Sequence, residues 1–200
     1  MGWPAAVDGL VQRICFGENS GMDASQALLD NYRFLARYNA WFNERLYAAC
    51  ETLPDGERRL DRGAFFGSIH GTLNHVVWGD KLWLARFVAQ GMGSEALSRD
   101  LLHVPEGAKH ATLLFDDWGA LKAERGRLDA AIEAWTAGLP ADAPLRIMKY
   151  SNTQGVRREH AAWKALTHFF NHQTHHRGQV TTLLMQSGVD VGMTDLISLA

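Results

Sequence analysis

The sequence has only two cysteines, Cys15 and Cys50, among its 200 residues. Two thiols are too few for a disulfide framework or for a zinc site built from four thiolates. The N-terminal stretch MGWPAAVDGLVQRICF has neither a basic start nor an uninterrupted apolar block, so it does not match a secretory signal. We therefore expect a cytoplasmic protein whose two cysteines are reduced and serve as packing residues rather than nucleophiles.

Long apolar runs and an excess of charge are also missing. No hydrophobic stretch approaches the roughly 20 residues that a membrane-spanning helix needs. The 20 basic and 22 acidic side chains give a formal net charge of −2, which offers no electrostatic basis for binding nucleic acid. The sequence also contains no glycine-rich phosphate loop, no nucleophile elbow and no cysteine–histidine nucleophile pair. The partner we expect is a small-molecule substrate, with neither nucleic acid nor membrane.

The composition changes near residue 22. Residues 1–21 contain four glycines and one proline, and GENSG at their end is typical of a turn or linker. Asp23 and Gln26 then stand three positions apart, which is a helix-start signal. The length of the chain suits one domain. We therefore expect an N-terminal extension over residues 1–21 and a single domain that begins at Met22 and spans residues 22–200.

Four long amphipathic helices are predicted within that domain. Apolar residues recur at helical spacing over about residues 24–50, 66–90, 112–137 and 158–187. Residues 91–111, punctuated by glycine and proline, are predicted to form a long crossover connection. Residues 145–150 alternate in polarity before the turn sequence SNTQG, which predicts a short hairpin. The expected fold is all-α: a four-helix bundle with a long crossover and a small hairpin before the last helix.

The stretch HFFNHQTHHRGQV, residues 168–180, holds four of the nine histidines. Because each helical residue advances about 100° around the axis, all four histidines share one helix face. The apolar stripe of the same helix divides them. His172 and His176 lie in or beside the stripe, whereas His168 and His175 lie on its solvent side.

The inward-facing pair favours a metal site. Rings at positions i and i+4 stand about 6 Å apart along a helix, a spacing at which both can reach one ion. A buried neutral imidazole needs partners for its nitrogens, and a metal ion satisfies one of them. The alternative is a structural role, in which these histidines form caps or hydrogen bonds without a metal.

A third ligand would have to come from elsewhere in the bundle. His70 and His75 of the second helix lie about 100° from the centre of its apolar stripe, on opposite sides, so the helical wheel does not separate them. Asp80 lies within that stripe, where it either orients a ligand histidine or pairs with an arginine such as Arg177; we favour the ion pair. Gln179, one turn after the histidine pair, is a candidate partner for a ligand ring or for bound water.

Three segments of the chain resemble the DinB/YfiT-like family of metalloenzymes, over roughly residues 24–188. LARYNAWFNERLY resembles the first helix of the family, GTLNHVVWGDKLWLARF the second, and HFFNHQTHHRGQVTTLL the fourth, with H-x-x-x-H followed by R-G-Q. The resemblance implies that His75 is the metal ligand of the second helix, and that His172 and His176 are the ligands of the fourth. It also implies a homodimer formed through bundle helices. Residues 1–21 have no counterpart in the family pattern.

The resemblance further implies a function. Three neutral imidazoles leave positions open on a divalent metal ion, unlike a closed four-ligand zinc site, and all-nitrogen ligation suits zinc or nickel. Characterised members of the family imply a metal-dependent transferase or isomerase that acts with a low-molecular-weight thiol as cofactor.

Two alternatives remain open. One is a metal-dependent hydrolase, which needs a general base near the open site. The candidates for that base by position are His168, Asp80 and Gln179. The other is a metal-stabilised binding or stress-response module without catalysis, because a fold does not fix a function. A polar, accessible cleft over the site favours an enzyme, whereas a site sealed by Trp78, Trp83 or Phe169 favours a structural role.

Overall fold

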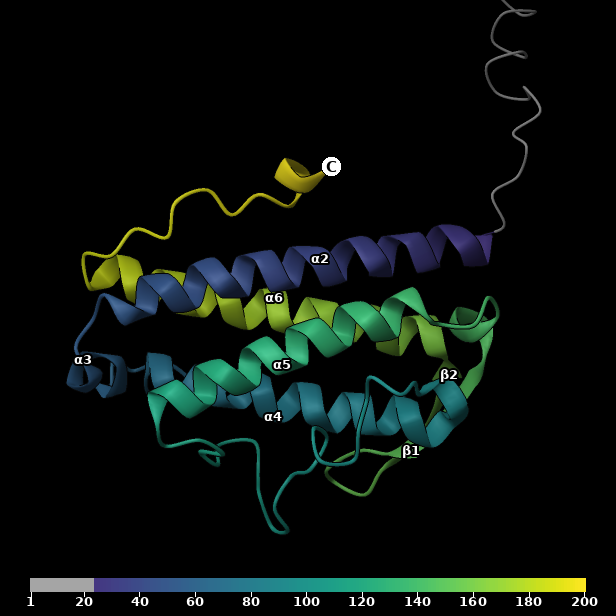
Figure 1. Ribbon diagram of the computed structural model, residues 1–200. Coiled ribbons are helices and arrows are strands. Elements are labelled where there is room, and N and C mark those ends of the chain that lie inside the picture. Colours follow the sequence, from purple (N-terminus) through teal and green to yellow (C-terminus); the bar gives the residue numbers. More distant parts are fainter. Residues whose placement is uncertain (1–23) are drawn as a thin grey trace, which may run out of the picture.

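The computed structural model describes residues 24–200, which form a bundle of four long helices (Figure 1). The helices are α2 (Ala24–Glu51), α4 (Ile69–Phe87), α5 (Trp118–Ala137) and α6 (Ala162–Gln186). Both α2 and α4 pack against α5 and α6. The predicted all-α four-helix bundle is therefore confirmed. The predicted extension over residues 1–21 and the predicted domain start at Met22 lie outside the described residues.

Shorter elements lie between these helices and after the last of them. They are the helix α3 (Asp55–Arg59), the π-helical turn η1 (Val88–Met92), and the 3₁₀ turns η2 (Ala143–Leu145) and η3 (Leu196–Leu199). Gly91 in η1 has a φ of 73°, in the left-handed region that favours glycine, and there the chain leaves the helical path of α4. Residues 93–117 then form the long crossover that leads to α5.

Three of the four long helices begin later than their apolar periodicity predicts, whereas α2 begins at Ala24 as expected. α5 begins at Trp118 rather than near residue 112, because the side chain of Asp117 caps it by accepting a hydrogen bond from the backbone N of Ala120 at 2.7 Å. α4 begins at Ile69 rather than near residue 66, because Ser68 caps it in the same way. α6 begins at Ala162 rather than near residue 158, because residues 157–161 form a strand. Periodicity reports which face is buried, whereas capping residues and strand pairing decide where a helix starts.

The hairpin before α6 is present as predicted. Its strands β1 (Ile147–Ser151) and β2 (Arg157–Ala161) are antiparallel, with Ser151 opposite Arg157. The side chain of Gln90, just after α4, donates to the carbonyl of Lys149 and accepts from its backbone N, both at 3.0 Å. These two bonds tie the hairpin to the end of α4.

An apolar core fills the space between the helices. Its largest fully buried side chains include Tyr32, Phe87, Trp135 and Phe169. Cys50 is also fully buried, and burial raises the pKa of its thiol to about 12, so it is a packing residue as expected. Cys15 lies outside the described residues. None of the helices within residues 24–200 combines the length and the apolar character needed to cross a membrane.

A buried polar network crosses the centre of this core. The carboxylate of Asp80 on α4 accepts hydrogen bonds from Arg125 Nη1 of α5 at 2.5 Å and from Gln173 Nε2 of α6 at 2.7 Å. Arg125 also pairs with Asp129 at 2.9 Å, and Asp129 accepts a hydrogen bond from Asn43 of α2 at 2.9 Å. All five side chains are buried. The network therefore connects all four long helices.

The favoured ion pair of Asp80 is thus confirmed, but the partner suggested from the sequence, Arg177, is wrong. Arg177 Nη1 donates to Asn39 Oδ1 at 2.5 Å, and its guanidinium carbon lies 4.9 Å from the ring centroid of Phe42. The true partner, Arg125, belongs to a different helix. The helical wheel of α4 shows that Asp80 points inward, but it carries no information about which neighbouring helix it faces.

Replacing Arg125 with Met should strongly destabilise the protein, because it leaves the carboxylates of Asp80 and Asp129 buried without a counter-ion. We expect the free energy of unfolding, measured in urea, to fall by about 3–5 kcal/mol. The matched control is Lys122→Met. Lys122 lies on α5, like Arg125, and forms an exposed pair with Glu51 of α2, so its loss should cost less than about 1 kcal/mol. Equal losses in the two variants would contradict the role given to Arg125.

Candidate metal centre

Three histidine rings from α4 and α6 meet beside the core. His75 lies on α4, and His172 and His176 lie one turn apart on α6, which packs against α4. The Nε2 atom of His172 lies 3.1 Å from Nε2 of His75 and 3.2 Å from Nε2 of His176. The candidate ligand atoms of the three residues all lie within 4.8 Å of one another. We call this group the histidine cluster; the structure brings together the three residues named as ligands above.

Hydrogen bonds fix the orientation of two of these rings. Nδ1 of His75 donates to the backbone carbonyl of His110 in the crossover at 2.8 Å. Nδ1 of His176 donates to Oε1 of Gln179 at 2.7 Å. A neutral ring that donates from Nδ1 carries its lone pair on Nε2, so both lone pairs point into the cluster. Metal-ligating histidines are commonly held by a hydrogen bond of this kind from the second nitrogen.

The rings of the cluster are neutral near pH 7. Burial lowers the pKa of His75 to about 4. It also lowers the pKa of His172 to about 3, with a further contribution from the neighbouring His176 and His75. The pKa of His176 is lowered by burial as well, against the opposing effect of its hydrogen bond to Gln179. Neutral imidazole is the form that binds a metal ion, so the donor atoms suit a divalent cation.

Gly79 of α4 allows His172 to reach the cluster. A Cβ atom added at Gly79 would lie 2.8 Å from Cε1 of the His172 ring, which is too close for a real contact. Any side chain at position 79 would therefore displace the His172 ring from its observed position. The close approach of α4 and α6 at this point therefore depends on glycine.

Sequence reasoning missed two further neighbours of the cluster, Phe66 and His110. The ring of Phe66 stacks on that of His75 with centroids 3.8 Å apart and lies edge-on to His176 at 5.5 Å. His110 contributes its backbone carbonyl, and its ring lies edge-on to that of Phe66 with centroids 6.3 Å apart. Phe66 precedes the observed start of α4, although periodicity predicted a helix from about residue 66, and a carbonyl group such as that of His110 is common to every residue type.

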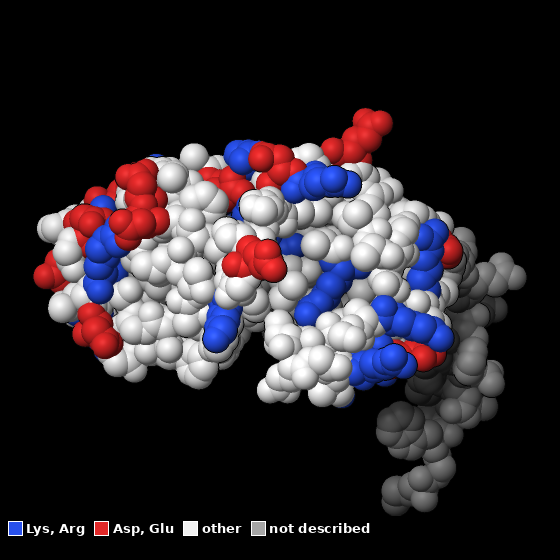
Figure 2. Space-filling model, turned by 90° about the horizontal axis from the view of Figure 1, so that it is seen from below, with Lys and Arg blue, Asp and Glu red and all other residues white. Residues whose placement is uncertain are grey.

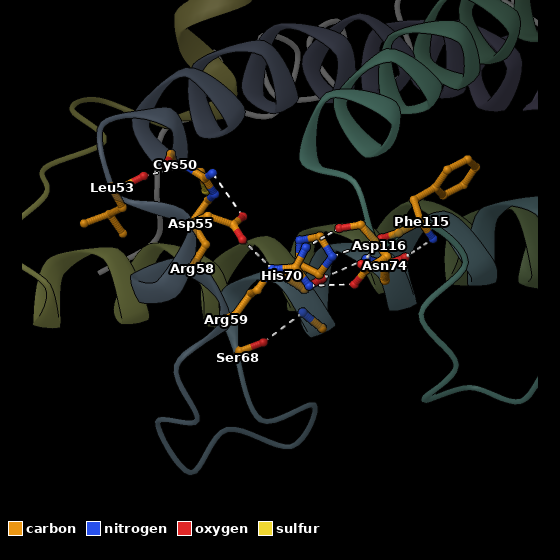
Figure 3. A network of polar contacts seen from close by, with 11 residues as sticks. Cys50, Leu53, Asp55, Arg58, Arg59, Ser68, His70, Asn74, Phe115 and Asp116 are labelled. Carbon is orange, nitrogen blue, oxygen red and sulfur yellow. Dashed lines mark hydrogen bonds and ion pairs between the residues drawn. The ribbon is translucent and has the colours of Figure 1, made fainter.

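His70, the other candidate on α4, serves a different purpose. Its Nε2 donates to the carbonyl of Phe115 at 3.0 Å. Asn74, one turn later, donates to the same carbonyl at 3.1 Å and accepts from the backbone N of Phe115 at 2.9 Å. Figure 3 shows His70 and Asn74 facing the segment of Phe115 and Asp116. His70 therefore anchors the end of the crossover and does not join the histidine cluster.

The structure also gives the positions of the two outward histidines and of the three aromatic residues that could cover the site. His168 and His175 are exposed on α6, as predicted. Trp78 packs against His75, with ring centroids 5.8 Å apart. Trp83 instead contacts His168, and Phe169 packs in the core against Phe87 and Trp135.

A surface groove borders the cluster. It encloses about 400 Å³ between α6 and the loop that precedes α4. Its lining includes Arg62, Phe65, His175, Gly178, Gln179 and Thr182. Gln179 both lines this groove and binds Nδ1 of His176, so one side chain separates the groove from the cluster.

Comparisons with known proteins place this arrangement in a family context. The model of a family described as the DinB family matches residues 25–200. The chain is also 27% identical over 161 residues to Protein DinB of Bacillus subtilis (strain 168), a match that covers 80% of this chain and 88% of that relative. No solved structure matches the chain significantly. The family match includes the histidine cluster and the whole crossover.

Replacing Gly79 with Ala should destabilise the protein, because the added methyl group collides with His172. Overpacking of this kind lowers the free energy of unfolding by about 1–3 kcal/mol. Gly126→Ala is the matched control: Gly126 lies inside α5, and a Cβ there meets nothing within 4 Å. That change should instead stabilise the protein by about 0.5–1 kcal/mol, because alanine favours helix. Urea unfolding measures both, and a stabilising Gly79→Ala would contradict the close packing at position 79.

Proposed function

The chain belongs to the DinB family, and we propose that it is a metalloprotein whose residues His75, His172 and His176 bind one divalent metal ion. The observation that carries this proposal is the convergence of three Nε2 atoms within 4.8 Å. The hydrogen bonds from Nδ1 of His75 and His176 support it, because they hold the lone pairs toward the common centre. We propose zinc or nickel as the ion, since both suit three imidazole ligands.

The reaction we propose for this centre is a transfer or isomerisation that uses a low-molecular-weight thiol. When bound, a divalent ion supplies a Lewis acid that favours the anionic form of a thiol at an open coordination position. The support is the resemblance to the DinB/YfiT-like family together with the groove beside Gln179, which suits a small-molecule substrate. On the same resemblance and composition, we propose that the protein acts in the cytoplasm as a homodimer.

The surroundings of the cluster favour thiol chemistry over hydrolysis. Of the three residues considered as a general base, Asp80 is buried in its ion pair with Arg125. Gln179 is engaged by His176, and an amide is in any case a poor base. His168 is exposed, with its ring centroid 5.9 Å from that of His172. A hydrolase that needs a general base besides the ion would therefore depend on His168, whereas a bound thiol is activated by the ion alone.

The metal content of the protein tests the ligand set. After dialysis against zinc or nickel, the native protein should retain one ion per chain, and His172→Ala/His176→Ala should retain less than roughly a tenth of that amount. The control His168→Ala/His175→Ala removes two histidines from the same face of α6 and should keep its metal. Equal metal in the native protein and in His172→Ala/His176→Ala would rule out the proposed site.

Gln179 should tune the affinity of the site without being a ligand. Gln179→Leu removes the acceptor that orients the His176 ring, and we expect metal affinity to fall by about 10–100-fold. Gln186→Leu, an exposed position on the same helix, is the control and should leave the affinity unchanged. Competition against a chromophoric chelator measures both constants. An unchanged affinity in Gln179→Leu would show that the hydrogen bond does not orient the ring.

A thiol assay tests the proposed reaction class separately. The metal-loaded protein should accelerate the attack of a small thiol, such as cysteine or glutathione, on chlorodinitrobenzene. In that reaction a C–S bond forms, the C–Cl bond breaks, and chloride and a proton are released. The metal-free protein should show no acceleration. If the metal-loaded protein accelerates no reaction in a panel of small thiols and electrophiles, the thiol proposal fails while metal binding stands.

A further inference from the structure

Arg86, near the end of α4, carries a charge that no acidic side chain of residues 24–200 balances. It is half-buried, and its guanidinium carbon lies 4.7 Å from the ring centroid of Trp83 and 4.9 Å from that of Tyr150. Its hydrogen bond to the carbonyl of Ser151 is long, at 3.5 Å. Within residues 24–200, no carboxylate forms an ion pair with it. A partly desolvated cation without a counter-ion is unfavourable, and a bound anion would relieve it.

Further positive charge surrounds this arginine. Tyr150 and Ser151, which it contacts, line a pocket of about 510 Å³ on the hairpin. The rest of the lining is Lys149, Arg157, Arg158 and Glu159. Glu159 pairs with Lys149 at 3.3 Å, which leaves the two arginines in excess. Figure 2 shows Lys and Arg side chains gathered at the end of the molecule that carries β1 and β2 in Figure 1. This end therefore attracts anions.

A continuous row of rings connects Arg86 with the histidine cluster. The ring centroid of His168 lies 5.9 Å from that of His172 and 5.0 Å from that of Trp83, over which Arg86 lies. His168 is exposed and Trp83 is partly exposed, so solvent reaches both of these rings. Gly79 touches His172, and Arg86 follows seven residues later on the same helix. That separation corresponds to about 10 Å along the axis, the length of a small peptide.

We propose that Arg86 binds the carboxylate end of an extended, peptide-sized thiol whose sulfur reaches the histidine cluster. Trp83 and Tyr150 flank the guanidinium and hold its planar face, so that its N–H groups can receive the carboxylate in two parallel hydrogen bonds. Arg157 and Arg158 raise the local concentration of the anionic ligand. The inference rests on the proposed function and narrows the thiol to a class that is anionic and about 10 Å long.

S-methylglutathione tests Arg86 apart from the metal, because this carboxylate-bearing tripeptide has a blocked sulfur. In the full chain, with or without metal, it should shift the indole NMR signal of Trp83, assigned with Trp83→Phe, in a saturable manner. Its diethyl ester, which lacks the carboxylates, should bind at least about tenfold more weakly. Arg86→Gln should bind both compounds as weakly as the native protein binds the ester, and Arg86→Lys should recover part of the difference. Arg37→Gln, an exposed change on α2, should have no effect.

Two results would overturn the proposal. One is the absence of saturable binding to the native protein; the other is equal binding of S-methylglutathione by the native protein and Arg86→Gln. Because this assay needs no metal ion, it tests the role of Arg86 even if the histidine cluster binds no metal. With the metal-loaded protein and glutathione as the reacting thiol, Arg86→Gln should raise KM by about tenfold and leave kcat unchanged. A fall in kcat at constant KM would instead place Arg86 outside thiol binding.

Discussion

The contact between Gly79 of α4 and His172 of α6 is the constraint on which the rest of the site depends. The His172 ring occupies the space where a side chain at position 79 would lie, so the two helices approach closely at this turn. From there the ring reaches both other members of the cluster with its Nε2 atom, at 3.1 and 3.2 Å. A larger residue at position 79 would collide with the His172 ring, so the ring or the helix that carries it would have to shift.

The same turn of α4 also carries Asp80, the central residue of the buried polar network. Asp80, the next residue, holds Arg125 of α5 and Gln173 of α6, and Gln173 directly follows His172. Burying these groups is costly, and their mutual hydrogen bonds offset that cost only in one arrangement of the helices. The polar network thus sets the register of α4 against α6 from inside the bundle, while Gly79 sets their distance beside the cluster. Stability and site geometry are coupled through two adjacent residues.

Local sequence patterns predicted a large part of this structure. Apolar periodicity predicted the four helices, and the stripe of α6 correctly turned His172 and His176 inward. The choice of His75 over His70 needed the resemblance to a family, because both lie equally far from the apolar stripe of α4. Two features come from contacts between separate segments, which no local pattern encodes: the partner of Asp80 on α5 and the ring of Phe66 on His75. A wheel shows which way a side chain points, whereas its partner depends on how separate helices pack.

The site therefore combines neutral donors and oriented rings with a neighbouring groove and, about 10 Å along α4, an arginine without an ion-pair partner among residues 24–200. The most direct measurement is a crystal structure of the metal-loaded protein with anomalous scattering recorded at the absorption edge of zinc or nickel. We predict one anomalous peak per chain, bonded to the Nε2 atoms of His75, His172 and His176, with the Nδ1 hydrogen bonds to the His110 carbonyl and Gln179 retained. A peak at any other position, or none at the three histidines in metal-saturated crystals, would contradict the proposed centre.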